Sequence, residues 1–414
     1  MRILLLTQWF DPEPTFKGLY FARALADAGH EVEVLTGFPN YPKGKVYKGY
    51  KIRPWQREVI DGITVNRVAL YPGHDRSPVR RILNYSSFGF SAATIGPMLV
   101  RKPDVVYVYN LATLGFAAKA LRLLKGCPFV VDVLDLWPEA VASSGMMSNR
   151  SAMWLLDKWC NGFYRSADHL VAVSQGYKRA LADRGIPDSR VDVIYNWCDE
   201  SQTRVSEKDT SLARELGMDG RFNILFAGNM GKVQALDAVI DAAKLVEAKS
   251  PNVQFVFIGD GVEVGNLKSK ASSMGLSNVI FLPRRPVSEI GSIMQLADVL
   301  LVHLKDDPLL RITIPSKTQA YMAMGKPVLM CVNGDAADLV TSADAGLVCK
   351  PEDPALIADV ACKLARMPAE QLSQMGANGL EYYRREMSIS VGVRRFEAIF
   401  ESVVEEHRTN HPQS

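Results

Sequence analysis

Cysteine is scarce in this sequence, and no pattern of cysteines indicates a metal site. Six cysteines are scattered over 414 residues, with no C-x-x-C pair and no histidine at the spacing of a zinc ligand. Several lie in apolar runs, where cysteine packs as a small hydrophobic side chain. We therefore expect reduced, structural cysteines and a cytosolic protein.

Long apolar runs are absent as well. No segment approaches about 18 consecutive apolar residues, the length that a helix needs to cross a bilayer. The N-terminal stretch M-R-I-L-L-L-T-Q-W-F is too short for the core of a signal peptide and predicts a first buried strand. Any membrane contact is therefore expected to be peripheral.

The sequence has no strong excess of one charge. Lys and Arg number 48 against 45 Asp and Glu, a formal net charge of +3, which is too small to indicate nucleic-acid binding. A hydrophobic content of 48% and a charged content of 22% are typical of a globular protein. The length fits two domains better than one.

The fingerprint of a nicotinamide-dinucleotide site is also missing. That site needs G-x-G-x-x-G directly after a first strand, whereas Trp9-Phe10-Asp11-Pro12 stands there. Gly259-Asp260-Gly261 follows a later strand and lacks the third glycine. The sequence therefore gives no support for NAD.

What is present is a regular alternation of strand and helix signals in both halves of the chain. In the N-terminal half, apolar runs predict strands at 3–6, 31–35, 105–108, 129–133 and 169–173. In the C-terminal half they predict strands at 223–227, 253–258, 279–282, 299–302 and 327–330. Alternation of this kind is typical of α/β domains with a parallel sheet covered by helices on both faces.

The polar stretch 199–219 has the composition of a linker, and 382–404 has an amphipathic helical pattern. We predict two Rossmann-like, doubly wound domains, 1–198 and 199–385. Their cleft is expected at the carboxyl ends of the strands, where such sheets bind ligands.

Two segments of the second half suit a diphosphate. Gly228-Asn229-Met230-Gly231-Lys232 lies between a predicted strand and a predicted helix, so glycine backbone, helix N–H groups and a cation meet there. The alternative interpretation is a tight turn followed by a solvated lysine.

The second segment runs from Arg311 through Thr313 to Ser316 and Lys317, ahead of another predicted helix. Here the alternative is that Ser316 is an N-cap and Lys317 a solvated residue of the first turn. Arg284 and Arg285 follow a neighbouring strand at the same sheet edge and add a third cationic point.

Taken together, these residues give the chain a resemblance to glycosyltransferase family 4, whose members have the GT-B fold. Within the family it is most similar to bacterial O-antigen and capsule enzymes that transfer N-acetylated deoxyaminosugars. The resemblance is carried by the opening M-R-I-L-L-L-T-Q-W-F-D-P-E-P-T-F-K-G, the block L-A-D-A-G-H-E-V-E-V-L-T-G-F-P-N-Y-P, D-L-W-P-E at 135–139, G-N-M-G-K at 228–232, I-G-D-G at 258–261 and P-S-K-T-Q-A-Y-M-A-M-G-K-P-V at 315–328.

The resemblance implies that the second domain binds the donor, that transfer retains the anomeric configuration, and that a C-terminal helix, 386–414, crosses back to the first domain. It implies that Lys232 and the Ser316-Lys317 helix start hold the diphosphate. The backbone at Arg285 would face the base, and Lys17-Gly18 would close over the donor.

The chain departs from the family pattern at the donor sugar. Two glutamates that the family usually carries eight positions apart are replaced by Ile312 and Ala320. Contacts to sugar and ribose must come from other residues, and Thr313, Gln319 or the pair Asp306-Asp307 are the candidates. The frequent N-domain histidine is missing too, and Asp135 stands near its place.

Transfer from a nucleotide-diphosphate donor builds negative charge on the leaving diphosphate, so fixed cations and N–H dipoles are expected there. Because the chain has no Asp-x-Asp sequence, we expect neither a metal nor another cofactor. Asp135 would orient the acceptor or steady the anomeric carbon, with Glu139 as a second choice. The alternatives are an N-cap for Asp135 and a surface acid for Glu139.

The basic, aromatic stretch 42–57 and the stretch 76–98 suit anionic lipid headgroups or a lipid-diphosphate acceptor. The alternatives are a solvated loop and a core helix. We expect a retaining, metal-independent transferase that passes a sugar from a nucleotide-diphosphate donor, UDP by preference, to a lipid-linked glycan of surface polysaccharide at the inner face of the cytoplasmic membrane. A nucleotide-sugar 2-epimerase and a catalytically silent nucleotide-sugar-binding subunit are the competing interpretations.

Overall fold

The computed structural model describes residues 1–73, 77–143, 149–200, 203 and 208–411. The chain forms two compact units: Met1–Tyr195 with Gly392–Ser414, and Asn196–Val391. The limits expected from the sequence, 198 and 385, lie a few residues from these. In the described part of the chain, no helix is apolar over a length that would cross a bilayer.

The first unit is built on an eight-stranded sheet in the order β3-β4-β2-β1-β5-β6-β7-β8. Its strands are β1 (Arg2–Leu6), β2 (Glu31–Gly37), β3 (Trp55–Ile60), β4 (Ile63–Val68), β5 (Val105–Tyr109), β6 (Phe129–Val133), β7 (His169–Ala172) and β8 (Val191–Val193). All neighbouring strands are parallel except β3 and β4. The predicted parallel α/β sheet is therefore confirmed.

The antiparallel hairpin β3–β4 was not expected from the sequence. Asp61 and Gly62 connect the two strands with φ of 47° and 83°, the left-handed geometry of a two-residue hairpin turn. The first three residues of β3 belong to the basic, aromatic stretch 42–57, for which a solvated loop was one alternative, and the residues of β3 alternate between exposed and half-buried. The sequence shows no alternation of polar and apolar residues here, because both faces of β3 carry polar and apolar side chains.

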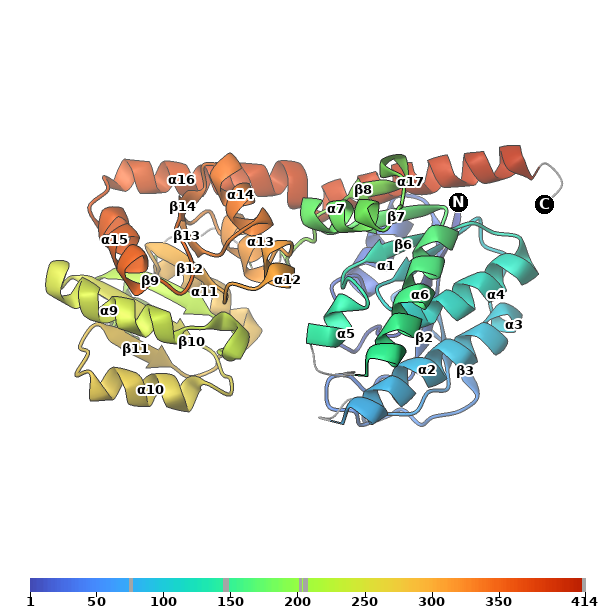
Figure 1. The fold of residues 1–414 in the computed structure, drawn as a ribbon, viewed down its shortest axis with the longest axis horizontal. Coiled ribbons are helices and arrows are strands. Elements are labelled where there is room, and N and C mark those ends of the chain that lie inside the picture. The colour runs from blue at the N-terminus through green and yellow to red at the C-terminus, as the bar shows by residue number, and fades with distance from the viewer. Residues whose placement is uncertain (74–76, 144–148, 201–202, 204–207, 412–414) are drawn as a thin grey trace. The chain divides into compact units, whose positions relative to one another are not determined.

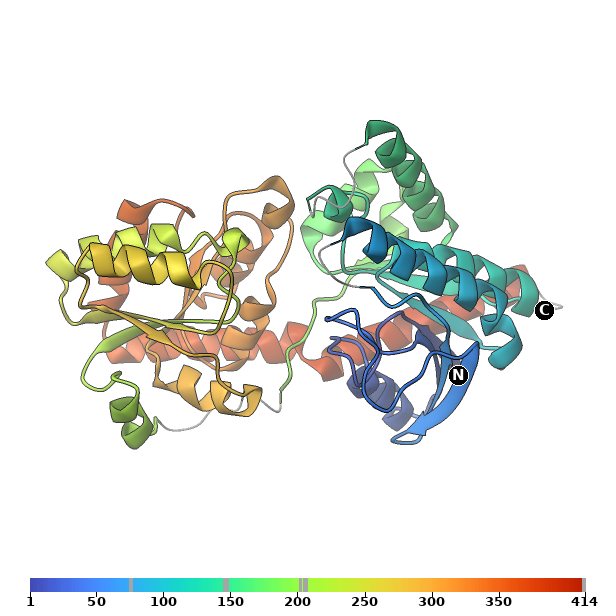
Figure 2. The same ribbon diagram turned by 90° about the horizontal axis from the view of Figure 1, so that it is seen from below.

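Helices cover both faces of this sheet (Figures 1 and 2). They are α1 (Leu19–Asp27), α2 (Pro78–Thr94), α3 (Gly96–Leu99), α4 (Gly115–Lys125), α5 (Glu139–Ser143), α6 (Arg150–Ser166), α7 (Gln175–Asp183) and α17 (Ile389–Asn410). Helices α2, α3, α4 and α6 lie on one face, and α1 and α17 lie on the other. The ring of Phe396 on α17 packs against Phe21 and Tyr107 at centroid distances of 5.3 and 5.5 Å.

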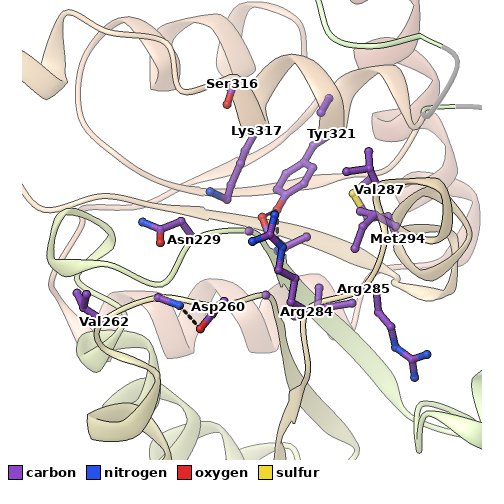
Figure 3. A pocket seen from close by; sticks show the side chains of 17 residues that line it. Asn229, Asp260, Val262, Arg284, Arg285, Val287, Met294, Ser316, Lys317 and Tyr321 are labelled. Atoms are coloured by element: carbon purple, nitrogen blue, oxygen red, sulfur yellow. Dashed lines mark hydrogen bonds between the residues drawn. The ribbon is translucent and has the colours of Figure 1, made fainter. Parts of the chain in front are cut away.

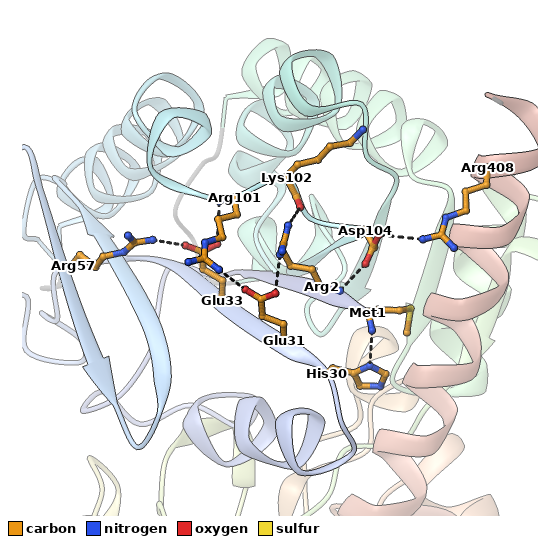
Figure 4. A network of polar contacts seen from close by, with 10 residues as sticks. All are labelled: Met1, Arg2, His30, Glu31, Glu33, Arg57, Arg101, Lys102, Asp104 and Arg408. Carbon is orange, nitrogen blue, oxygen red and sulfur yellow. Dashed lines mark hydrogen bonds and ion pairs between the residues drawn. The ribbon is translucent and has the colours of Figure 1, made fainter. Parts of the chain in front are cut away.

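Charged side chains hold the amino-terminal edge of this sheet (Figure 4). Arg2 Nε donates to Glu31 at 3.1 Å, and the Arg2 backbone N–H donates to Asp104 at 2.7 Å. Asp104 also accepts from Arg408 on α17 at 3.2 Å. The network thus joins β1, β2 and the C-terminal helix at the edge opposite the one where the carboxyl ends of the parallel strands meet.

One ion pair is completely buried inside the first unit. Lys17 Nζ contacts the Asp132 carboxylate on β6, and both side chains have no solvent exposure. The Tyr107 hydroxyl donates to the same carboxylate at 2.6 Å, and Phe396 covers the ammonium at 4.9 Å from its ring centroid. The pair therefore connects the segment before α1 to the sheet and to α17.

The second unit has a six-stranded parallel sheet in the order β11-β10-β9-β12-β13-β14. Its strands are β9 (Phe222–Ala227), β10 (Val253–Ile258), β11 (Val279–Leu282), β12 (Val299–His303), β13 (Val328–Cys331) and β14 (Gly346–Val348). Apolar side chains of β9 and β10 form one core with those of α9 (Asp237–Lys249) and α15 (Pro354–Ala365). All six cysteines of the chain are buried.

The remaining helices of this unit are α8 (Thr210–Glu215), α10 (Val264–Ser273), α11 (Val287–Leu296), α12 (Pro308–Arg311), α13 (Ser316–Ala323), α14 (Asp335–Ser342) and α16 (Ala369–Tyr382). Helix α8 falls within the stretch interpreted as a linker, of which 201–202 and 204–207 lie outside the described residues. The helix expected at 382–404 is divided, because a π-helical turn at Tyr383–Met387 separates α16 from α17.

The buried ion pair generates a stability prediction. In Lys17→Met the carboxylate of Asp132 stays buried without its cation, so the free energy of unfolding should fall by about 3 kcal/mol or more. Arg23 pairs with Asp61 in the same unit at 3.2 Å, but both side chains are more than half exposed. Arg23→Met should therefore change the free energy by about 0.5 kcal/mol at most. Urea unfolding measures both, and equal losses would contradict the role given to the buried pair.

Candidate active site

A pocket of about 790 Å³ opens at the carboxyl ends of the strands in the second unit (Figure 3). Two glycine-containing loops after β9 and β10 form one wall, the segment after β11 with α11 forms another, and the start of α13 forms the third. The residues that line it are Ala227, Gly228, Asn229, Ile258, Gly259, Asp260, Gly261, Val262, Arg284, Arg285, Val287, Ile290, Met294, Ser316, Lys317, Ala320 and Tyr321.

The two loops are packed backbone against backbone. Gly228 N–H donates to Ile258 O, and Met230 N–H donates to Asp260 O, both at 2.8 Å. A Cβ atom at Gly259 would stand 2.0 Å from Gly228 O, and Gly259 has φ of 141°. Only glycine fits this contact and this conformation. Because glycine has no side chain, the main-chain atoms of the loop lie at the pocket surface.

Lys317 is the cation nearest to these loops. Its Nζ lies 4.7 Å from the centroid of the Phe226 ring, and a Cβ at Gly228 would stand 3.0 Å from that Nζ. Burial lowers the pKa of Lys317 to about 8. Among the described residues, no carboxylate forms an ion pair with it. The pocket therefore contains a desolvated ammonium whose charge is not balanced by the protein.

The same cation stands on the first turn of α13. This helix begins at Ser316 without a side-chain cap, so the N–H groups of its first turn and the positive end of its dipole face the pocket. Gln319, a candidate for contacts to sugar or ribose, is buried, and its side-chain amide lies beside the carbonyl oxygens of Pro315 and Ser316. Lysine, serine and helix start together form a site for an anion.

The opposite side of the pocket is apolar. Val287, Ile290 and Met294 on α11 line it. Figure 3 shows Arg284 extending across the pocket toward Tyr321, whereas Arg285 points away from it. Arg285 faces two acids instead, Glu289 at 3.6 Å and Glu215 at 4.0 Å. A ligand with a flat apolar group and a neighbouring anion could therefore contact the apolar side chains of α11 and the ammonium of Lys317 in one cavity.

The structure brings five of the predicted donor residues to this pocket. Gly228, Asn229, Arg285, Ser316 and Lys317 all line it. Of these, Arg285 lines the pocket, but its guanidinium faces Glu289 and does not point into the pocket. The two segments that the sequence selected separately therefore meet at one site.

Other predicted residues of the second unit lie outside this pocket. The expected helix is present as α9, but a 3₁₀ turn, Lys232–Gln234, precedes it and leaves Lys232 exposed, and neither Gly231 nor Lys232 lines the pocket. Arg311 donates twice to Asp306, at 2.7 and 2.8 Å. Thr313 Oγ1 donates to Leu310 O. The side chains of Arg311 and Thr313 therefore form contacts within the protein, and these contacts compete with the donor contacts that the sequence predicted for them.

Two predicted donor residues of the first unit have structural roles. Lys17 is paired with Asp132 beneath Phe396, so its ammonium does not face solvent. Gly18 precedes α1, and a Cβ there would stand 2.4 Å from the Asp11 carboxylate, which accepts from the N–H of Leu19 at 2.7 Å. Glycine at 18 therefore allows Asp11 to cap α1.

Asp135 lies at the carboxyl end of β6 and is accessible to solvent. Asn110 holds it, donating to its carboxylate at 2.9 Å and accepting from its N–H at 2.8 Å. Surrounding protein raises the pKa of this carboxyl through partial desolvation, against the effect of the Asn110 hydrogen bond. Glu139 is exposed too, but its carboxylate forms an ion pair with Arg184. Asp135 is thus the better placed of the two predicted acids.

Aromatic rings surround this part of the first unit, and sequence analysis did not select them. Trp9 lies 5.2 Å from Tyr41 and 6.0 Å from Tyr85, and Tyr85 lies 6.2 Å from Trp137, between ring centroids. The charge of Asp135 acts on the Tyr85 phenol. These rings come from four separate segments, so no local spacing signals them.

Two family models match the chain. The model for the glycosyl transferase 4-like domain matches residues 19–197, and the model for glycosyl transferases group 1 matches residues 221–367. Together they cover most of both units. The chain is a family 4 glycosyltransferase with the GT-B fold.

Curated relatives agree with this assignment. The transferase is 28% identical over 341 residues to a putative colanic acid biosynthesis glycosyl transferase, WcaI, of Escherichia coli K12, with 78% of this chain and 82% of the relative covered. It is 26% identical to a probable glycosyltransferase, WbjE, of Pseudomonas aeruginosa, over 74% of this chain and 77% of the relative.

Solved structures show the same fold for the transferase. HepE of Anabaena, solved in complex with UDP, matches with a TM-score of 0.69 at 17% identity, covering 97% of this chain and 100% of that chain. A trehalose 6-phosphate synthase of Burkholderia multivorans matches with a TM-score of 0.72 at 16% identity, covering 99% and 98%.

Proposed function

We propose that this transferase takes its sugar from a UDP donor whose diphosphate binds between Lys317 and the Gly228 loop. The observation that carries the proposal is the buried ammonium of Lys317, which has no carboxylate partner among the described residues. A diphosphate supplies the missing negative charge. The apolar side chains of α11 offer a surface for the base, and a structural neighbour was solved with UDP.

The proposed acceptor is a lipid-linked glycan of surface polysaccharide, and the proposed sugar is an N-acetylated deoxyaminosugar. The name of one relative, which refers to colanic acid biosynthesis, supports the polysaccharide part. With such an acceptor the transferase would work at the inner face of the cytoplasmic membrane.

In the proposed reaction, the bond between the anomeric carbon and the donor diphosphate breaks, and an acceptor oxygen forms a new bond to that carbon with retention of configuration. The acceptor proton leaves with the diphosphate. Lys317 and the first N–H groups of α13 stabilise the charge that develops on the leaving group. Because these groups are part of the protein, we propose that transfer needs no metal ion.

Asp135 is proposed to orient the acceptor. Asn110 fixes its carboxylate, the Tyr85 phenol lies within reach of its charge, and the rings of Trp9 and Tyr41 continue the aromatic cluster from Tyr85. Aromatic faces of this kind pack against sugar rings, while a carboxylate accepts a hydrogen bond from a sugar hydroxyl. The arrangement thus supports a glycan acceptor in the first unit.

The Lys317 assignment predicts how donor binding depends on pH. A bound diphosphate raises the pKa of Lys317, so binding above about pH 8 requires uptake of a proton. The affinity for a UDP-sugar should stay constant from pH 7 to about 8 and then fall by up to about tenfold per pH unit. Isothermal titration with EDTA present measures this and tests metal independence.

Three variants complete that test. Lys317→Ala should weaken donor binding by about tenfold or more, whereas Lys317→Arg keeps its charge and should lose the pH dependence. Lys232→Ala changes a lysine that is exposed and lies outside the pocket, so it should bind nearly as wild type. A greater loss in Lys232→Ala than in Lys317→Ala would overturn the assignment, and a requirement for Mg²⁺ would refute metal independence.

The acceptor assignment predicts a different kinetic effect. Asp135→Asn should bind the donor normally but transfer the sugar at least about a hundredfold more slowly. Glu139→Gln is the matched control, and it should retain normal transfer because Glu139 pairs with Arg184 at the surface. Radiolabelled transfer to extracted lipid-linked glycan measures both. A normal rate in Asp135→Asn would remove this residue from the mechanism.

A further inference from the structure

Four helices on one face of the first unit carry large apolar side chains that are exposed. Met98 on α3 and Leu123 on α4 each expose 84% of their surface, Phe90 on α2 exposes 70%, and Trp154 on α6 exposes 58%. Single exposed apolar residues are ordinary, but a contiguous group marks a surface that binds a partner.

These residues belong to one layer of helices, which we call the apolar–basic face: 78–94, 96–99, 115–125 and 150–166. Both ribbon views place α2, α3, α4 and α6 on the same side of the sheet (Figures 1 and 2). The exposed Phe116 of α4 stacks on the half-buried Trp159 of α6 with ring centroids 4.1 Å apart, so these two helices touch.

The charge of the same helices is strongly one-sided. Helix α2 carries two cations, α4 three and α6 three, whereas Asp157 on α6 is the one acid in the four helices. Lysine ammonium groups lie over two tryptophan rings: Lys158 is 4.9 Å from the centroid of the exposed Trp154, and Lys119 is 4.8 Å from that of the half-buried Trp159.

The stretch 42–57 is less suited to the same role. Arg57 donates to Glu33 at 3.1 Å, and the Tyr50 ring faces the buried Arg67 at 5.0 Å. Its cations and aromatic residues are thus partly used inside the unit. The stretch 76–98, the other expected membrane segment, contributes α2 and α3 to a face that also includes α4 and α6.

We infer that the apolar–basic face docks the transferase on an anionic lipid bilayer, with Phe90, Met98, Leu123, Leu124 and Trp154 in the interface and the lysines at the headgroups. Apolar side chains bordered by cations and nearly free of acid match the chemistry of such a surface. Arg122 is paired with Asp168, and Arg165 donates to the Arg184 carbonyl. Lys119, Lys125 and Lys158, however, form no ion pair among the described residues, and a protein partner of mixed charge would leave part of this positive charge unmatched. The inference rests on the proposed lipid-linked acceptor, because such an acceptor lies in the bilayer.

The test uses the full chain and vesicles of phosphatidylcholine with or without phosphatidylglycerol. Wild type should co-sediment with the anionic vesicles and much less with pure phosphatidylcholine. The double change Leu123→Glu and Leu124→Glu should weaken binding by about tenfold or more. Val59→Glu is the matched control: Val59 is 67% exposed in the same unit, but on β3, and its binding should equal that of wild type.

Tryptophan fluorescence locates the contact. Anionic vesicles should shift the emission of wild type to shorter wavelength, and Trp154→Phe should lose most of this shift while still sedimenting. Loss of binding in Val59→Glu as large as in the double variant would overturn the inference. So would a dimer, seen by light scattering, that the double variant converts to monomer without any change in lipid binding.

Transfer to a water-soluble acceptor separates this inference from the proposed function. The double variant should retain wild-type turnover with such an acceptor and lose turnover with acceptor in vesicles. Retained turnover in both assays would contradict the docking surface alone, whereas absence of turnover in wild type with every acceptor would contradict the proposed function alone.

Discussion

The site depends on one buried charge, the ammonium of Lys317, which lies beside Gly228 and forms no ion pair with a carboxylate among the described residues. Burial of a cation without a carboxylate is unfavourable, and it lowers the pKa of Lys317 to about 8. The surrounding structure maintains this arrangement through the packed glycine loops and the fixed start of α13. An incoming diphosphate relieves the unfavourable burial, so binding free energy is concentrated on the group that leaves in the reaction.

The first unit also contains a buried lysine, but this one has a carboxylate partner. Lys17 forms an ion pair with Asp132, and the Tyr107 hydroxyl donates to the same carboxylate oxygen. That cation stabilises the fold and joins α17 to the sheet. Asp135, by comparison, stays accessible to solvent after the end of β6. A lysine near the sheet edge therefore serves structure in one unit and is available for a ligand in the other, depending on whether a carboxylate faces it.

Much of the fold followed from the sequence because strand and helix periods repeat in both halves. The motifs at 228–231 and 316–317 predicted residues of the pocket, since glycine loops and helix starts are local features. Lys232 and Arg311 could not be placed from the sequence, because a 3₁₀ turn and the contact with Asp306 decide their directions. Tyr321 and Met294 were missed because helical spacing gives them the pattern of core residues. The exposed side chains of α4 and α6 were missed for the same reason.

Hydrogen–deuterium exchange of the full chain with and without UDP, in EDTA, tests the central claim most directly. The account predicts that UDP slows exchange in the loops at 228–231 and 259–262 and in the first turn of α13, where the diphosphate covers main-chain amides. Protection confined to the first unit, or no protection at saturating UDP, would contradict it.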